Sequence, residues 1–442
     1  MISNDTTPTL LGGISSSFRT NPYTGGHIEV RRARGATLEL TDGRELIDTF
    51  MAHGSTVLGH GEPAVMQAVQ HELEAGVLLG YETGLAAAVA DRLARILPAA
   101  ERIRFCSTGT EAVATALRMC RAFTGREIVI KIDGHYNGSS DYAMVNSTAA
   151  AIDRDNPGGR PSQRIRSCSG IPEPSADSIV PVPWNDAEAL ETALSMYEER
   201  VAAVLMVPLD LNNGCIRPAD GYLNTARRLT AAHGVLLVFD EVLSGFKTGL
   251  SGATGTFGGD PDVTVWSKAV ASSFPLSVVA GREDVMAMMA LPLPQGTLQG
   301  GTHAGNIPGL AAAQATLDVL EEPAFYETLT ERTREFAAAL ESRMRAAGMT
   351  ARVQSAGCGY GIYVGTDEPI RSCADVRRHV DQQMAKRLFT ACLEEGVYFH
   401  TDLTVSIAHT DEVLGEIVSR VGRAADRVVD GAALTGAREL SR

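Results

Sequence analysis

The stretch "VLLVFDEVLSGF", residues 235–246, places five apolar residues directly before two carboxylates, Asp240 and Glu241. Residues 235–239 have the composition of a fully buried strand. A buried carboxylate needs a partner, because otherwise its pKa rises and it becomes neutral. Asp240 is therefore a candidate for a salt bridge or a helix cap, or for contact with a cationic ligand.

The chain on both sides of this stretch alternates helix-period segments with short apolar runs. Such runs include "RIRFCS" (102–107), "EIVIKI" (127–132), "VAAVLMVP" (201–208), "VTVWS" (263–267) and "SVVAG" (277–281). This alternation predicts an α/β fold, in which a mostly parallel central sheet has helices on both faces. Sheets of this kind hold their ligands at the carboxyl ends of the strands.

The same pattern predicts how the chain divides into domains. We expect residues 61–309 to form the large domain, with residues 147–174 as a lid, since that segment is rich in Gly, Pro, Ser and Arg. Residues 310–442 should form a smaller α+β domain, to which residues 1–60 contribute. The four arginines of the lid segment either attract an acidic substrate or keep the segment soluble: Arg154, Arg160, Arg164 and Arg166.

Composition excludes several classes of protein. The 442 residues carry a net charge of −14, which argues against nucleic acid or an anionic membrane as the main partner. Seven scattered cysteines show neither metal-ligand spacing nor a disulfide framework, so no metal site is expected. The sequence has no signal-peptide pattern and no apolar run long enough to span a membrane, and we expect a cytoplasmic protein.

Two motifs follow predicted strands. In "RFCSTGTEA" (104–112), Thr108, Gly109 and Thr110 stand where a helix would begin, which suits either a phosphate group or an ordinary threonine cap. In "VTVWSKAVASSFP" (263–275), Lys268 comes just after an apolar run, among small and apolar residues. Most lysines are solvated surface groups, but a desolvated lysine has a lowered pKa and can form a Schiff base.

Two further turns resemble ligand-binding loops. Tyr136 follows a strand in "KIDGHYNGSSD" (131–141) and either stacks on a flat ring or only packs. Thr302 lies in the glycine-rich "GGTHAGN" (300–306), before a predicted helix.

Taken in order, these motifs resemble those of the class III aminotransferases, which are fold-type I enzymes dependent on pyridoxal 5'-phosphate (PLP). The likeness is greatest to the glutamate-1-semialdehyde 2,1-aminomutase branch. It extends over nearly the whole chain, from "GGISSSFR" (12–19) through "STGTEA", "VFDEVLSGF" and "WSKAVASSFP" to "SIAHTDE" (406–412).

The resemblance implies a role for each candidate residue. Lys268 would form the internal aldimine and move the substrate proton, and Asp240 would pair with the pyridine nitrogen. Val242 and Tyr136 would pack on the two faces of the ring. The phosphate would lie at Ser107, Thr108, Gly109 and Thr110.

The resemblance also implies a homodimer and small-molecule substrates. Thr302 would reach the phosphate from the neighbouring subunit, so that the active site lies at the subunit interface. Arg19 matches an arginine that binds the substrate carboxylate in this branch.

Departures from the family pattern leave the reaction open. The usual Tyr-His-Gly reads Tyr136-Asn137-Gly138, and "GVYFHTDLTVSIAH" (396–409) lacks the acidic stretch of the aminomutases. We expect first an aminotransferase that works by a ping-pong mechanism, with pyridoxamine phosphate (PMP) as the intermediate form and an α-, β- or D-amino acid as substrate. The alternatives are an aminomutase, a PLP-dependent epimerase or decarboxylase, and a cofactor-free protein that retains the fold.

Overall fold

The computed structural model describes residues 9–147 and 151–431, and the chain divides into two compact units. The large unit comprises residues 63–326 and 370–378, and the small unit comprises the remainder. In the described part of the chain no helix has the length and apolar character needed to cross a membrane.

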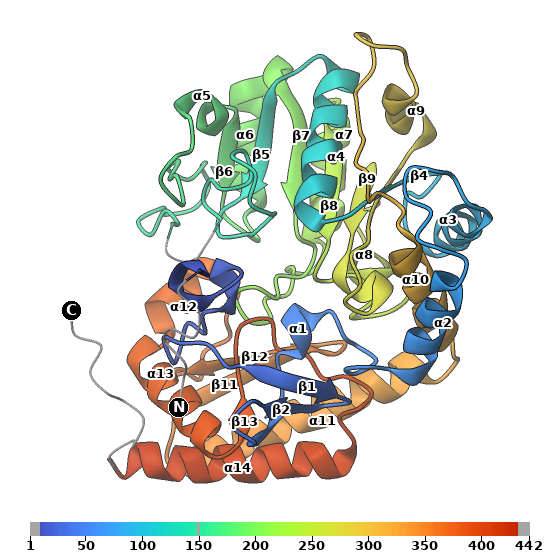
Figure 1. Cartoon of the computed structure of the whole chain (residues 1–442). Coiled ribbons are helices and arrows are strands. Elements are labelled where there is room, and N and C mark those ends of the chain that lie inside the picture. The colour runs from blue at the N-terminus through green and yellow to red at the C-terminus, as the bar shows by residue number, and fades with distance from the viewer. Residues whose placement is uncertain (1–8, 148–150, 432–442) are drawn as a thin grey trace. The chain divides into compact units, whose positions relative to one another are not determined.

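A seven-stranded sheet forms the centre of the large unit (Figure 1). Its strands, in spatial order, are β4 (Arg102–Cys106), β10 (Ser277–Gly281), β9 (Val263–Trp266), β8 (Leu236–Glu241), β7 (Val201–Met206), β5 (Ile128–Ile132) and β6 (Ile179–Val182). Only β10 runs antiparallel to its neighbours, and the other adjacent pairs are parallel. The predicted α/β fold with a mostly parallel sheet is therefore confirmed.

Helices cover this sheet because the connections between parallel strands must cross back over it. The helices of the large unit are α2 (Pro63–Leu73), α3 (Gly84–Ile96), α4 (Gly109–Thr124), α5 (Glu173–Asp177), α6 (Ala187–Tyr197), α7 (Tyr222–Ala232), α8 (Gly252–Phe257), α9 (Glu283–Met286), α10 (Ile307–Leu320) and α12 (Cys373–His379, whose last residue belongs to the small unit). The boundary expected at residue 309 thus falls inside the large unit, since α10 packs on α2 and α3.

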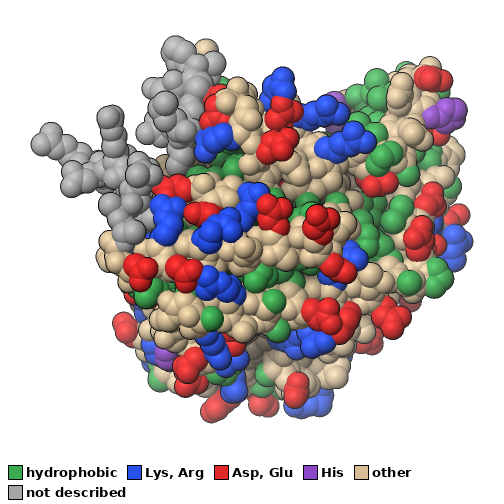
Figure 2. All heavy atoms as spheres, turned by 90° about the horizontal axis from the view of Figure 1, so that it is seen from below, with side chains coloured by type: hydrophobic (Ala, Val, Ile, Leu, Met, Phe, Trp, Pro, Cys, Tyr) green, Lys and Arg blue, Asp and Glu red, His purple; other side chains and the backbone are tan. Residues whose placement is uncertain are grey.

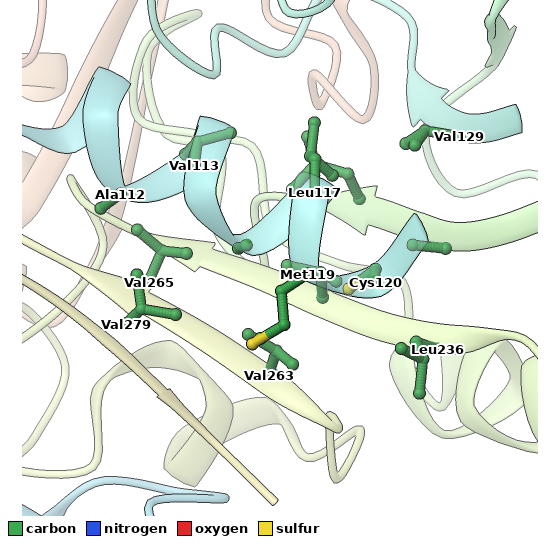
Figure 3. Packing of buried hydrophobic residues seen from close by; sticks show 14 of the residues in the cluster. Ala112, Val113, Leu117, Met119, Cys120, Val129, Leu236, Val263, Val265 and Val279 are labelled. Carbon is green, nitrogen blue, oxygen red and sulfur yellow. The ribbon is translucent and has the colours of Figure 1, made fainter. Parts of the chain in front are cut away.

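The core between α4 and the sheet fixes where the helix begins. Val113 and Leu117 of α4 lie over strands that carry Val263, Val265 and Val279 (Figure 3). These side chains are almost entirely buried. Because β4 leads into α4 through only two residues, this packing holds the first turn of α4 at the carboxyl edge of the sheet.

The small unit contains two sheets and the two longest helices of the described residues, α11 (Phe325–Ala346) and α14 (Asp411–Val429). One sheet has the order β1 (Val30–Arg34), β2 (Thr37–Leu40), β3 (Glu45–Asp48) and β13 (Val397–Tyr398), and the other pairs β11 (Ala351–Ala356) with β12 (Gly359–Val364). Asp42-Gly43 lies in the turn between β2 and β3, with Gly43 at φ +87°. The other helices are α1 (Met51–Gly54) and α13 (Gln382–Glu394).

Helix α14 shows how the small unit meets solvent. Its buried stripe includes Ile417 and Val421. Its outer face forms ion pairs such as Arg420–Glu416 and Arg427–Glu394. Figure 2 shows one face of the molecule, on which acidic and basic side chains are interspersed. Ion pairs between neighbouring side chains need charges of both signs in this arrangement.

The predicted lid segment is described for residue 147 and residues 151–174, whereas residues 148–150 lie outside the described residues. The described part consists of turns and bends, with α5 beginning at Glu173. Arg164 donates to the Ile179 carbonyl at 2.9 Å and pairs with Asp177, so at least this arginine has partners within the protein.

Candidate active site

Asp240 is the penultimate residue of β8 and is buried. Its Oδ2 accepts a hydrogen bond from Asn137 Nδ2 at 2.8 Å, and its Oδ1 accepts one from the Val242 N–H at 3.0 Å. Burial raises the pKa of the Asp240 carboxyl, whereas the two donors and the nearby charges of Lys268 and Lys131 lower it. These contacts prepare a buried carboxylate for a cationic partner.

The adjacent carboxylates have different roles because successive side chains of a strand face opposite ways. Leu236 and Val238 belong to the core cluster that includes α4, and Asp240 continues their face of β8. Glu241 faces the other side, where its carboxylate accepts hydrogen bonds from the N–H and Oγ1 of Thr254, both at 2.7 Å. Glu241 therefore binds the first turn of α8, and Asp240 is left for the site.

Lys268 begins a short 3₁₀ helix, η4 (Lys268–Ala271), which is separated from β9 by Ser267 alone. Strands β8 and β9 are parallel neighbours, with Asp240 opposite Val265, so the two candidate residues emerge at the same edge of the sheet. Lys268 is half-buried and has φ +49°, a left-handed conformation that is rare for a residue with a side chain. Strained backbone of this kind is concentrated at functional sites.

The first turn of α4 is organised by a capping arrangement. Thr108 is the N-cap, and its Oγ1 accepts from the Glu111 N–H at 3.2 Å. The Glu111 carboxylate reaches back to the Ser107 N–H at 2.9 Å. The threonine cap considered as an alternative is thus present, yet it coexists with a helix N-terminus whose next N–H groups, at Gly109 and Thr110, suit an anion.

Two glycines let the parts of the site approach one another. A Cβ on Gly109 would lie 2.9 Å from Val242 Cγ1, and one on Gly138 would lie 2.8 Å from Thr110 Oγ1. Gly138 also has φ +93°, which disfavours any other residue. The turn at the start of α4 is therefore packed against Val242 and against the loop that follows β5.

That loop carries Tyr136, which is half-buried, and Asn137, which is buried. The sequence identified Asn137 only as a departure from a histidine pattern and gave no indication of its partner. The structure brings it to Asp240 across 103 residues of sequence. The position of Asn137, a polar residue directly after the candidate stacking residue Tyr136, was the one feature of the sequence that could have indicated a role in the site.

The remaining two candidates are exposed. Thr302 is exposed in the large unit, and a Cβ on its neighbour Gly301 would lie 3.2 Å from Glu111 Oε1 of the same chain. Arg19 is exposed on a 3₁₀ turn, η2 (Ser17–Arg19), in the small unit. The structure thus gathers Asp240, Val242, the start of α4 and the loop after β5 within the large unit.

Comparison with known proteins agrees with this arrangement. A family model for class III aminotransferases matches residues 20–421. Glutamate-1-semialdehyde 2,1-aminomutase of Laribacter hongkongensis (strain HLHK9) is 34% identical over 423 residues, which cover 94% of this chain and 96% of that protein. The crystal structure of an omega-transaminase from Sphaerobacter thermophilus has a TM-score of 0.85 and 27% identity, with 95% of each chain covered.

A glutamate-1-semialdehyde aminomutase from Pseudomonas aeruginosa PAO1, solved in complex with PMP, has the same fold, with a TM-score of 0.82 and 23% identity. The aligned region covers 96% of this chain and 92% of the aminomutase chain. The family match spans most of the chain, and the curated relative is similar over nearly its full length. The chain therefore belongs to the class III aminotransferase family, whose cofactor is pyridoxal 5'-phosphate.

Proposed function

We propose that this protein is a PLP-dependent aminotransferase that moves an amino group between an amino acid and an oxo acid in a ping-pong cycle. The observation that carries the proposal is the emergence of Asp240 and Lys268 from adjacent parallel strands at one edge of the sheet. A lysine for a Schiff base and a charged partner for the pyridine nitrogen, such as an aspartate, are the groups with which proteins bind this cofactor.

The residues present fit the cofactor. The glycines at positions 109 and 138 leave space where a Cβ would collide, and the start of α4 offers N–H groups to a phosphate. Burial raises the pKa of the Asp240 carboxyl in the protein without cofactor. A cation beside this carboxyl would stabilise its ionised form. When bound, PLP supplies an electron sink for the bond that breaks at the substrate amine.

Each residue of the chain then has a definite task. The Lys268 amine would hold the cofactor and would be the group that moves the substrate proton. Asp240 would pair with the ring nitrogen and keep it protonated, and Tyr136 and Val242 would pack on the ring. Ser107, Thr108, Gly109 and Thr110 bind the phosphate.

Two further residues complete the proposed site from outside this group. Thr302 of the partner subunit would contact the phosphate, which makes the homodimer the active form and places the site at its interface. Arg19 would bind the substrate carboxylate, because its guanidinium matches a carboxylate with two parallel hydrogen bonds.

An aminomutase is the second candidate, and the 34% identity to a curated aminomutase favours it. In that reaction a single substrate supplies both the amine and the carbonyl, so no second oxo acid is consumed. The absence of an acidic stretch in residues 396–409 favours the aminotransferase instead.

The deciding experiment adds single D- and L-, α- and β-amino acids to the purified holoenzyme and follows the visible absorbance of the bound cofactor. An aminotransferase loses that absorbance with its amino substrate and recovers it only when an oxo acid is added. An aminomutase turns over its substrate without a second oxo acid. Failure of every amino acid to change the spectrum of a cofactor-loaded protein would contradict the aminotransferase, and the same failure with an amino aldehyde would contradict the aminomutase.

A further inference from the structure

Lys131 is a second lysine near the site, and it is wholly buried. It is the fourth residue of β5, which is paired on one side with β6 and on the other with β7. An ammonium group inside a sheet costs several kcal/mol unless it is compensated, so its partners indicate what it does.

All three donors of this ammonium meet main-chain carbonyls. Lys131 Nζ donates to the carbonyls of Ile132 at 3.3 Å and Asn146 at 3.2 Å, and also to that of His135. The His135 and Asn146 carbonyls lie near the two ends of the loop that carries Tyr136 and Asn137. One side chain therefore joins the start of this loop to its end, with one donor for each carbonyl.

The same ammonium lies among acidic groups from four elements. These are Asp133 at the end of β5, Asp210 after β7, Asp240 on β8 and the Cys373 thiol on α12. Burial lowers the pKa of Lys131 to about 7, and the acidic groups oppose that effect. The His135 imidazole is also buried nearby, and its pKa is well below the usual range, so it adds no charge near neutral pH.

We propose that Lys131 is a positioning residue for the cofactor site: its ammonium fixes the loop that carries Tyr136 and Asn137, and its charge favours the ionised form of Asp240. The inference rests on the proposed function, since it assigns Lys131 to the support of the cofactor. Lys131 needs no contact with substrate or cofactor for this role.

The two parts of the role have different pH dependences. Lys131 carries its charge below about pH 7, where Asp240 is closest to protonation. Removing the charge raises the pKa of Asp240, so the acid limit of cofactor binding moves to higher pH. Loss of the hydrogen bonds to the loop, in contrast, still weakens binding at the higher pH values, where Asp240 is fully ionised.

The test measures the dissociation constant of PLP from the full-length protein at several values between about pH 6 and about pH 8.5, by titrating cofactor-free protein. Lys131→Met should bind PLP more weakly than wild type at about pH 6, by at most the roughly tenfold that one pKa unit gives, and the ratio of the two dissociation constants should fall as the pH rises. Taking the ratio to wild type cancels the titration of the cofactor's own phosphate.

Two variants complete the design. Lys131→Arg keeps the charge and should show a ratio independent of pH, and Lys386→Met changes an exposed lysine and should match wild type. If Lys131→Met does not fold, Lys131→Gln replaces it, because its amide can still donate to the loop while carrying no charge.

Three outcomes would contradict, respectively, the positioning role of Lys131, the electrostatic part of that role, and the proposed function. An unchanged dissociation constant in the neutral variant contradicts any positioning role, and a ratio constant with pH contradicts the electrostatic part. If wild-type protein itself fails to bind PLP at Lys268, as borohydride reduction and peptide mass would show, the proposed function fails instead.

Discussion

Asn137 Nδ2 donates a 2.8 Å hydrogen bond to Asp240 Oδ2, and this bond joins the loop after β5 to the end of β8. The Val242 N–H donates to the other carboxylate oxygen. Unlike a histidine, the asparagine carries no titratable proton at this position. Its own Oδ1 is buried and has no hydrogen-bond partner in the described structure, so the side chain is held mainly through Asp240.

Replacing Asn137 with Leu should therefore weaken cofactor binding. The loss of one donor to a buried carboxylate raises the pKa of Asp240 further and costs about 1.5–3 kcal/mol, or roughly 10- to 150-fold in the dissociation constant. The measurement is a PLP titration of cofactor-free protein at several pH values. Asn137→His restores a donor and should recover most of the affinity; equal binding by Asn137→Leu and wild type would refute the role.

Lys268→Ala should abolish covalent attachment of the cofactor and lower turnover by at least about 10²- to 10⁴-fold, because the same amine moves the proton. The chain contains only four lysines, at positions 131, 247, 268 and 386, so the modified peptide is easily assigned after borohydride reduction. Lys386→Ala is the matched control, since that lysine is exposed. A reduced cofactor found on another lysine of wild-type protein would contradict the assignment.

Gly109→Ala should impair the cofactor site and lower the stability of the protein by a limited amount. The new methyl would lie 2.9 Å from Val242 Cγ1, so Val242 must move, at a cost of about 1–3 kcal/mol. Gly84→Ala is a matched control: Gly84 also begins a helix, α3, and no atom lies within 4 Å of its added Cβ. Comparing PLP dissociation constants and melting temperatures separates a local effect from a global one.

Asp240 and Glu241 should give opposite phenotypes when each loses its charge. Asp240→Asn should keep its stability and lose most of its cofactor affinity. Glu241→Ala leaves the N–H groups of Ala253 and Thr254 without their acceptor and should lower the free energy of unfolding by about 2–4 kcal/mol. Denaturant unfolding and PLP titration of both variants would show the contrast; loss of binding by a stably folded Glu241→Ala would contradict it.

His409 should make the protein less stable in acid. It is buried in the small unit, where its Nε2 donates to the Asp48 carbonyl at 2.8 Å and its Nδ1 accepts from the Ser406 N–H at 3.0 Å. Burial lowers its pKa to about 4, so the unfolded chain binds the proton more readily. The contribution of the neutral His409 imidazole to the free energy of unfolding is complete above about pH 6.5 and is lost as the pH falls toward 4. The full size of this contribution is about 3 kcal/mol.

Denaturant unfolding followed by far-ultraviolet circular dichroism at about pH 7 and about pH 5 measures this loss. Tryptophan fluorescence is unsuitable, since both tryptophans, Trp184 and Trp266, lie in the large unit. His409→Asn should reduce the difference between the two pH values, whereas His71→Gln, at an exposed position, should leave it unchanged. An equal pH dependence in His409→Asn and wild type would count against the account.

The sequence was sufficient for the fold and for the strand ends. Buried parallel strands are continuous apolar runs in the sequence. The first charged residues after such runs, Asp240 and Lys268 among them, therefore mark where the strands end. Lys131 shows the limit: it interrupts an apolar strand, and only the tertiary structure reveals that three carbonyls and several acids surround it.

Long-range contacts account for what could not be predicted. Helix α12 belongs largely to the large unit although its neighbours along the chain belong to the small one, and Cys373 lies against Gly134. Helix α10 likewise packs with α2, more than 200 residues earlier. Local periodicity carries no information about such partners, and the expected boundary at residue 309 relied on periodicity alone.

The alternation of Asp240 and Glu241 on β8 makes this strand intolerant of changes in length. Deleting one residue between Leu236 and Phe239 would either turn the glutamate toward the site and the aspartate toward α8 or, if the two carboxylates kept their places, turn the apolar side chains before the deletion to the opposite faces of the sheet. Protein engineers who wish to reshape the substrate pocket should therefore vary the loops and leave the length of this strand untouched.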